Sequence, residues 1–117
     1  MSTIGKHWYA GSPNIVSTLH ISPIRALLYN FDAENLSAFG SFLQLFDNIA
    51  APVLLNVPTY SYLVGPGQLL AVQVPGPNND QGRLFVSGIW AAWSSTPEFY
   101  TPTAAIGPIN ASGRYRE

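Results

Sequence analysis

Residues 41–74 read SFLQLFDNIAAPVLLNVPTYSYLVGPGQLLAVQV, and this stretch decides the fold class. Short runs rich in aliphatic and aromatic residues alternate with turn-forming residues, which is typical of β-strands joined by tight connections. Proline and glycine interrupt the stretch at Pro58 and at Gly65-Pro66-Gly67. The pattern therefore predicts four strands, over residues 41–46, 52–57, 60–64 and 68–74.

The same pattern continues on both sides of this stretch. It predicts three further strands over residues 14–21, 24–29 and 83–93, with a bend or bulge at Gly88 in the last of them. The one helix expected covers residues 32–38, with Asp32 as its N-cap. Turn residues recur at short intervals and no crossover helices follow the strands. The sequence therefore predicts an all-β fold, an antiparallel β-sandwich of jelly-roll-like form.

The two ends of the chain differ from the middle in composition. Residues 1–13 and 101–117 are rich in Gly, Pro, Ser, Thr and Ala, and such segments rarely form long strands. The predicted organisation is therefore an N-terminal arm over residues 1–13, a β-sandwich domain over 14–100 and a C-terminal arm over 101–117. We expect both arms to contact neighbouring subunits and to lie outside the sandwich core.

Between Asp47 and Asp80 the chain runs for 32 residues without Asp, Glu, Lys or Arg. Charged residues make up 9% of the whole sequence, whereas about a quarter is usual in a soluble domain. A small domain exposes most of its residues at least in part, so some of its surface must be uncharged and apolar. Such surfaces mark association sites. The sequence therefore predicts self-association through residues 48–79, with a homotrimer as the expected form.

Composition also argues against several classes of partner. The chain has five scattered basic residues and a net charge of −1, so we expect no nucleic-acid binding. It has no cysteine, which excludes disulfides and thiolate chemistry. Its start lacks the apolar segment of a secretory signal, and no apolar run reaches the length of a membrane span. We therefore expect a protein made in the cytoplasm, with no membrane partner.

Groups suited to catalysis are few. The two histidines, His7 and His20, have no second metal ligand at a typical spacing. The sequence contains no nucleophile elbow, phosphate loop or dinucleotide fingerprint. Asp47 is the only charge between Leu36 and Asn79, and we expect it to accept backbone N–H bonds in a turn. The sequence thus predicts no enzyme, no catalytic residue, no cofactor and no metal site.

Aromatic side chains are the remaining candidates for a binding surface. Trp90 and Trp93 are three residues apart in a predicted strand, so they should face opposite sides, one toward the core and one toward an interface. Tyrosines such as Tyr60 and Tyr62, which share a face, suit both protein interfaces and sugars. A core or subunit contact is preferred, and a glycan site is the alternative. The predicted interface residues are Trp8, Tyr9, Leu55, Tyr60, Tyr62, Trp93 and Tyr100.

Several short motifs follow one another in an order that resembles a family of small virion structural proteins of tailed bacteriophages and prophages. The motifs are Leu28-Tyr29-Asn30, Gln44-Leu45-Phe46-Asp47, Asn56-Val57-Pro58, Val64-Gly65-Pro66-Gly67, and Phe85-Val86-Ser87-Gly88-Ile89 before Ser94-Ser95-Thr96. The resemblance covers about residues 26–103. The chain departs from the family in its Gly-Pro-Gly turn, where Pro-x-Gly is common, and in the tryptophans after Gly88.

The resemblance implies a role in a virus particle. Proteins of this family look like compact β-sandwiches that add to a symmetric particle, as head decoration or as parts of a collar, tail or fibre. It implies a capsid decoration protein that stabilises the head through apolar contacts between subunits. The major capsid protein or other virion proteins would then be its partners, and the virion its location. A receptor- or glycan-binding module of a tail, collar or fibre is the alternative.

Overall fold

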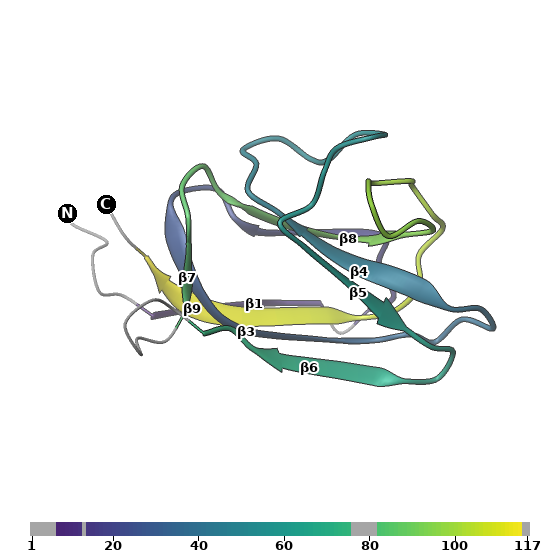
Figure 1. Ribbon diagram of the computed structural model, residues 1–117. Coiled ribbons are helices and arrows are strands. Elements are labelled where there is room, and N and C mark those ends of the chain that lie inside the picture. The colour runs from purple at the N-terminus through teal and green to yellow at the C-terminus, as the bar shows by residue number, and fades with distance from the viewer. Residues whose placement is uncertain (1–6, 13, 76–81, 116–117) are drawn as a thin grey trace.

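The computed structural model describes residues 7–12, 14–75 and 82–115. Within these residues the chain forms nine strands and no helix, arranged as two antiparallel sheets packed face to face (Figure 1). The strands are β1 (His7–Gly11), β2 (Thr18–Ser22), β3 (Ala26–Glu34), β4 (Ser41–Phe46), β5 (Tyr60–Val64), β6 (Leu69–Gln73), β7 (Arg83–Phe85), β8 (Ile89–Ser94) and β9 (Ile109–Tyr115). The predicted all-β, sandwich-like architecture is confirmed.

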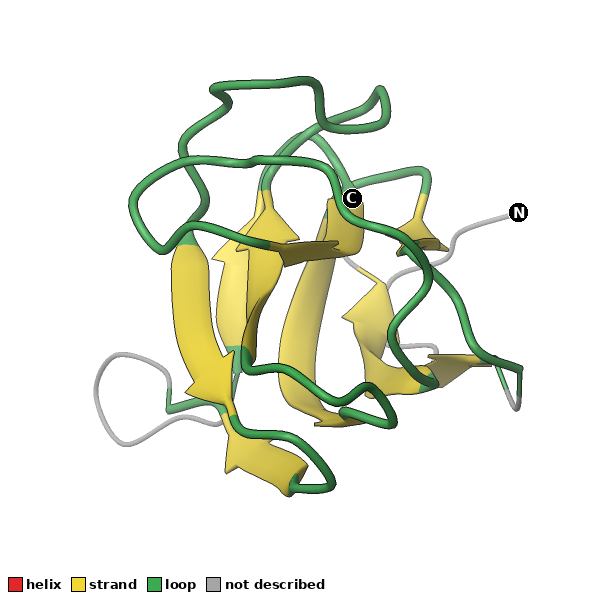
Figure 2. Ribbon diagram, turned by 90° about the vertical axis from the view of Figure 1, so that its right-hand side faces the viewer, coloured by secondary structure: helices red, strands yellow, loops and turns green. Residues whose placement is uncertain are grey.

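The larger sheet has the strand order β1-β9-β3-β6, and the smaller sheet has the order β2-β8-β4-β5. Strand β3 is long enough to hold two partners on one side: β6 pairs with residues 30–34 of β3, and β7 pairs with residues 26–28. Every paired strand runs antiparallel to its neighbour. Figure 2 shows these strands joined by loops and turns alone, several of which gather above one end of the sandwich.

The core lies between the sheets, where inward side chains from both of them meet. Strand β3 carries Leu28 and Phe31, which are both buried although three positions apart in the chain. The register with β9 shifts between Leu28 and Asn30, which is a β-bulge with one extra residue in β3. The extra residue changes the alternation of faces, so that Leu28 and Phe31 both point into the core. Trp93 is fully buried in the same core, and its indole Nε1–H donates to the carbonyl oxygen of Gly107 at 3.2 Å.

The helix predicted over residues 32–38 is wrong. Residues 32–34 are the end of β3, with Ala33 buried and with Asp32 and Glu34 half-buried on the opposite face. Alternating burial is the period of a strand, and pairing with β6 and β9 on both sides supplies the hydrogen bonds that a short helix would otherwise make. Two acidic residues near a turn therefore mark the solvent face of a strand here.

Two strand predictions also need correction. Residues 52–57 form a turn and irregular loop and not a strand, and residues 83–93 divide into β7 and β8. A bend or bulge within one strand was predicted at Gly88; instead the strand ends at Phe85 and the next begins at Ile89, directly after Gly88, where φ is 154°. A Cβ atom at Gly88 would meet the carbonyl oxygens of Asn48 and Ser22, so glycine allows three chain segments to come together at this point.

The prediction that the terminal segments lie outside the core is wrong for the residues that the structure describes. Residues 7–11 form β1, and residues 109–115 form β9, which lies between β1 and β3. Trp8, Ile109 and Ala111 belong to the buried core. Glycines in these segments allow close packing between strands and do not prevent strand formation. Within the predicted arms, residues 1–6, 13 and 116–117 lie outside the described residues.

Candidate functional site

The connection between β4 and β5 carries a cluster of exposed apolar side chains, which we call the apolar loop (residues 49–57). Figure 1 shows this teal segment projecting above the two sheets. Its exposed members are Ile49, Val53, Leu54, Leu55 and Val57, with exposed fractions from 58% to 78%. The loop belongs to the part of the sequence that contains no charged residue. It therefore presents apolar surface that contains no charged side chain of its own.

Backbone hydrogen bonds hold the apolar loop in place. The N–H of Leu55 donates to the carbonyl oxygen of Tyr100 at 2.9 Å, and the N–H of Tyr100 donates to the carbonyl oxygen of Asn56 at 2.7 Å. The side-chain Oδ1 of Asn56 accepts from the N–H of Val53 at 2.9 Å. At the start of the loop, the indole N–H of Trp90 donates to the carbonyl oxygen of Ile49 at 3.1 Å. The exposed side chains thus stand on a fixed backbone.

Asp47 anchors the chain just before the apolar loop. Its Oδ2 accepts from the backbone N–H of Val86 at 3.0 Å, and its Oδ1 accepts from that of Ser87 at 2.8 Å. The predicted acceptor role is confirmed, but the donors lie about 40 residues further along the chain and not in the turn that Asp47 begins. Only the sandwich, which places β4 beside β8, brings these groups together.

Leu55 has an unusual backbone conformation at the tip of the loop. Its φ is 74°, and it is the only non-glycine residue with positive φ among the residues described. An L-residue with a side chain adopts this left-handed region at a cost, and glycine or asparagine is usually found there. The leucine side chain is 61% exposed, so packing within the chain does not account for its presence.

The predicted interface residues divide into three groups in the structure. Trp8, Trp93 and Tyr100 are buried in the chain, which leaves them almost no surface for a neighbouring subunit, so they are corrected from interface to core. Tyr60 and Tyr62 are half-buried and pack against Phe31, with ring centroids 6.4 Å and 5.8 Å from it. Leu55 and Tyr9 are exposed.

Trp90 and Trp93 face opposite sides of β8, as predicted. Trp93 belongs to the core between the sheets, whereas Trp90 packs on the outer side beside Phe46 and Ala92. The ring of Trp90 stacks on His20, with centroids 4.1 Å apart and an angle of 5° between the planes. The pair covers the outer face of the smaller sheet where β2 and β8 meet.

Two tyrosines have altered ionisation. Burial raises the pKa of Tyr100 above its usual value. Burial also raises the pKa of Tyr62, and the neighbouring phenol of Tyr60 raises it further because two phenolates would repel each other. Both shifts favour the neutral phenol, which is the form that packs against other side chains in the fold.

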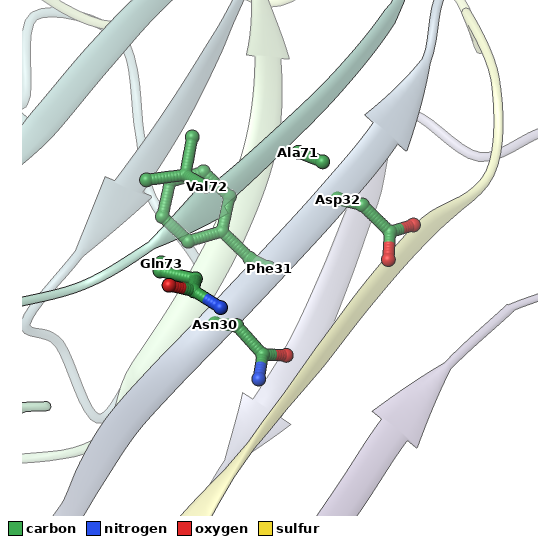
Figure 3. A pocket seen from close by; sticks show the side chains of 6 residues that line it. All are labelled: Asn30, Phe31, Asp32, Ala71, Val72 and Gln73. Atoms are coloured by element: carbon green, nitrogen blue, oxygen red, sulfur yellow. The ribbon is translucent and has the colours of Figure 1, made fainter. Parts of the chain in front are cut away.

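The outer face of the larger sheet is polar and carries a shallow depression. Asn110 Nδ2 donates to Asp32 Oδ1 at 2.9 Å, and Ser112 Oγ donates to Asn30 Oδ1 at 2.7 Å. The hydroxyl of Tyr9 donates to Asn110 Oδ1 at 2.8 Å. Figure 3 shows the depression, of about 200 Å³, lined by Asn30, Phe31, Asp32, Ala71, Val72 and Gln73.

Metal ligands do not gather in the described part of the chain, where no group of three or more His, Cys, Asp and Glu side chains is placed to hold an ion. The same residues include no helix that is long and apolar enough to cross a membrane.

The prediction of interface residues missed most of the apolar loop. It included Leu55 but not Ile49, Val53, Leu54 or Val57. The absence of charge over residues 48–79 pointed to this region. A strand over 52–57 would have buried every second residue, however, and so the exposure of consecutive apolar residues was not expected. A comparison of the sequence with models of known protein families and with curated proteins gave no match.

Proposed function

We propose that this protein is a non-enzymatic structural component of a tailed-phage virion, a decoration protein that attaches to the head through its apolar loop. In this proposal the partners are further copies of the chain, grouped as trimers, and the major capsid protein or another virion protein. The single observation that carries the proposal is Leu55, an exposed leucine held at a φ of 74°.

Leu55 supports attachment because its conformation has a cost that the isolated chain does not recover. Strained backbone positions are retained mainly where they serve a function. A glycine at this site would adopt the same φ without the cost. The leucine side chain therefore lowers the free energy of the state in which it is buried against another protein.

The rest of the apolar loop supports the same reading. Burying one aliphatic side chain contributes roughly 1.5 to 3 kcal/mol, and the loop offers five such side chains on a backbone that is already ordered. A fixed backbone lowers the entropy lost on binding. Because the loop carries no charge, no ion has to be desolvated when it docks.

We further propose a jelly-roll connectivity for the sandwich. Support comes from the strand order, in which β1-β9-β3-β6 faces β2-β8-β4-β5. Double-sheet jelly rolls include viral capsid domains and lectin domains. Fold alone does not determine function. The jelly-roll similarity is therefore an analogy, and the proposal depends on Leu55.

The experiment measures attachment and stability for one substitution. Leu55→Gly should keep or raise the melting temperature, because the strain is relieved, and should lower the copy number of the protein in purified particles. Leu36→Asn removes an exposed leucine from another loop and is the matched control. For the wild type, quantitative mass spectrometry should find many copies of this protein for each hundred copies of the major capsid protein. Absence of the wild-type protein from particles, or full incorporation of Leu55→Gly, would contradict the proposal.

The polar depression favours a second candidate function, glycan binding at a tail, collar or fibre. Amide and carboxylate groups of Asn30, Asp32 and Gln73 line it, and such groups bond sugar hydroxyls. Tyr9 is 73% exposed on β1 and is held by Asn110, so its ring is a fixed surface for stacking. Titration with neutral oligosaccharides, followed by NMR, should then shift the amide signals of residues 30–32 and 71–73. Unchanged spectra at millimolar sugar would exclude this candidate.

A further inference from the structure

Strand β6 (Leu69–Gln73) is an edge strand of the larger sheet. Among the described residues, β3 is its one neighbour in that sheet, and Figure 1 shows β6 along the lower border of the sandwich. The free side of an edge strand presents backbone N–H and C=O groups that can pair with another strand.

Two hydrogen bonds establish which residues of β6 present these groups. Val74 N–H donates to the carbonyl oxygen of Tyr29 at 2.8 Å, and Asn35 N–H donates to that of Gln68 at 3.0 Å. In an antiparallel ladder, bonds to one neighbour recur at every second residue. Even-numbered residues from 68 to 74 therefore point their backbone groups toward β3. Those of Leu69, Ala71 and Gln73 point outward, and the side chains of these three residues are exposed.

The usual protection of an edge strand is missing from β6. Natural proteins block exposed edges with charges, prolines or bulges. The segment reads LLAVQ, which contains neither a charge nor a proline, and its register with β3 has no shift. Strand β2, at one edge of the smaller sheet, differs from β6 in having an irregular register after His20.

We propose that β6 pairs antiparallel with β6 of a second copy of this chain, about a two-fold axis at Ala71. In this register Ala71 faces Ala71 of the second copy, and Leu69 faces Gln73 of the second copy. A two-fold axis places each group opposite itself, so any charge at the axis would repel its copy, and β6 has none. Among the described residues, the nearest carboxylate on the same face is Asp32, one strand further in. The two copies of Asp32 would lie roughly 14 Å apart, beyond the range of strong interaction in salt.

This inference rests on the self-association in the proposed function and adds a two-fold contact to the trimers assumed there. It does not use the apolar loop, which Figure 1 places on the opposite side of the sandwich from β6. A two-fold contact through β6 leaves the loop free to dock on the particle, and it can join copies that belong to neighbouring trimers.

The first test places charges at the axis. Ala71→Lys and Ala71→Glu should each weaken self-association at least about tenfold, measured by sedimentation over a range of protein concentrations. An equimolar mixture of the two variants should restore association, because Lys then faces Glu. Val86→Lys adds a charge at an exposed residue away from β6 and should associate as the wild type does. Failure of the mixture to associate, or undiminished association of either variant alone, would overturn the proposal.

The second test uses the wild-type protein and does not depend on any variant. Hydrogen exchange of the amides of Leu69, Ala71 and Gln73 should slow as the protein concentration rises, whereas those of Leu70 and Val72 should be protected throughout. Exchange at 69, 71 and 73 that does not depend on concentration would overturn pairing between copies. If the protein is monomeric and Ala71→Lys is nevertheless lost from particles, β6 binds another virion protein and a second copy is excluded. Leu55→Gly should associate normally, so the two proposals fail separately.

Discussion

The Oδ1 atom of Asp47 lies 2.8 Å from the backbone nitrogen of Ser87, and this contact joins the end of β4 to the turn before β8. The second carboxylate oxygen accepts from Val86, so one side chain satisfies two consecutive backbone N–H groups. Gly88 follows directly and packs its backbone against Asn48. Asp47 therefore stabilises the point where the chain leaves one sheet and enters the other.

Asp47→Ala should lower the free energy of unfolding by about 2 kcal/mol, because hydrogen bonds to a charged acceptor are among the stronger ones. Asp47→Asn keeps one acceptor oxygen and should lose about half as much. Urea denaturation measures both values, with Glu98→Ala as the control for the loss of an exposed carboxylate. Equal stability of Asp47→Ala and Glu98→Ala would show that the contact contributes nothing.

Trp8 and Tyr9 are neighbours on β1 that face opposite sides, which makes them a matched pair. Trp8 is 9% exposed and packs in the core, whereas Tyr9 is 73% exposed. Trp8→Ala should cost about 3 kcal/mol of stability, and Tyr9→Ala less than about 1 kcal/mol. Removal of residues 1–13 should destabilise the domain more than either, since it removes the whole of β1 from the side of β9. An unchanged melting temperature of the truncated protein would contradict the role of β1 in the core and would support the original prediction of a separate N-terminal arm.

Gly107 lies where two segments approach closely. A Cβ atom there would collide with the carbonyl oxygen of Glu34, and the carbonyl of Gly107 already accepts from Trp93. Gly107→Ala should therefore cost about 3 kcal/mol, because the backbone has to move. Gly40→Ala is the control, since its Cβ would make only ordinary contacts with Leu63 and should change stability by less than about 0.5 kcal/mol. Thermal unfolding of the two variants measures the difference in stability. Similar melting temperatures would contradict the close contact between Gly107 and Glu34.

Alkaline pH should destabilise the fold through Tyr62 and Tyr100. The pKa of each phenol is higher in the folded chain than in the unfolded chain. Their contribution to stability is therefore complete below about pH 10, the usual value for tyrosine, and is lost as the pH rises through the folded pKa. Replacing both residues by phenylalanine should make the free energy of unfolding less dependent on pH in this range. Denaturant titrations from about pH 8 to 11 test this, and an identical pH dependence in the double variant would refute it.

Regular strands in the middle of the chain were predictable because their local sequence pattern favours the strand conformation that they adopt in the sheet. Residues 41–46 and 60–64 form β4 and β5 with the predicted bounds. Gly88 also marks an irregularity in the backbone, as expected, although the structure has two separate strands there and not one bent strand. The candidate site was predictable only in part. The charge-free region contains the apolar loop, but the predicted strand over 52–57 concealed the exposure of its side chains.

The sequence by itself determined the class of the fold and the chemical character of the surface. Strand periodicity is local, and a segment without charges stays uncharged in any fold. Tertiary structure alone decided the positions of β1 and β9, because segments rich in glycine and small residues become strands only when other strands pair with them: β9 pairs with β1 and β3, and β1 pairs with β9. It also decided that Asp47 binds Ser87 and that Leu55 faces solvent. Contacts between residues far apart in the chain arise from the pairing of strands and the packing of the two sheets, and no local pattern encodes them.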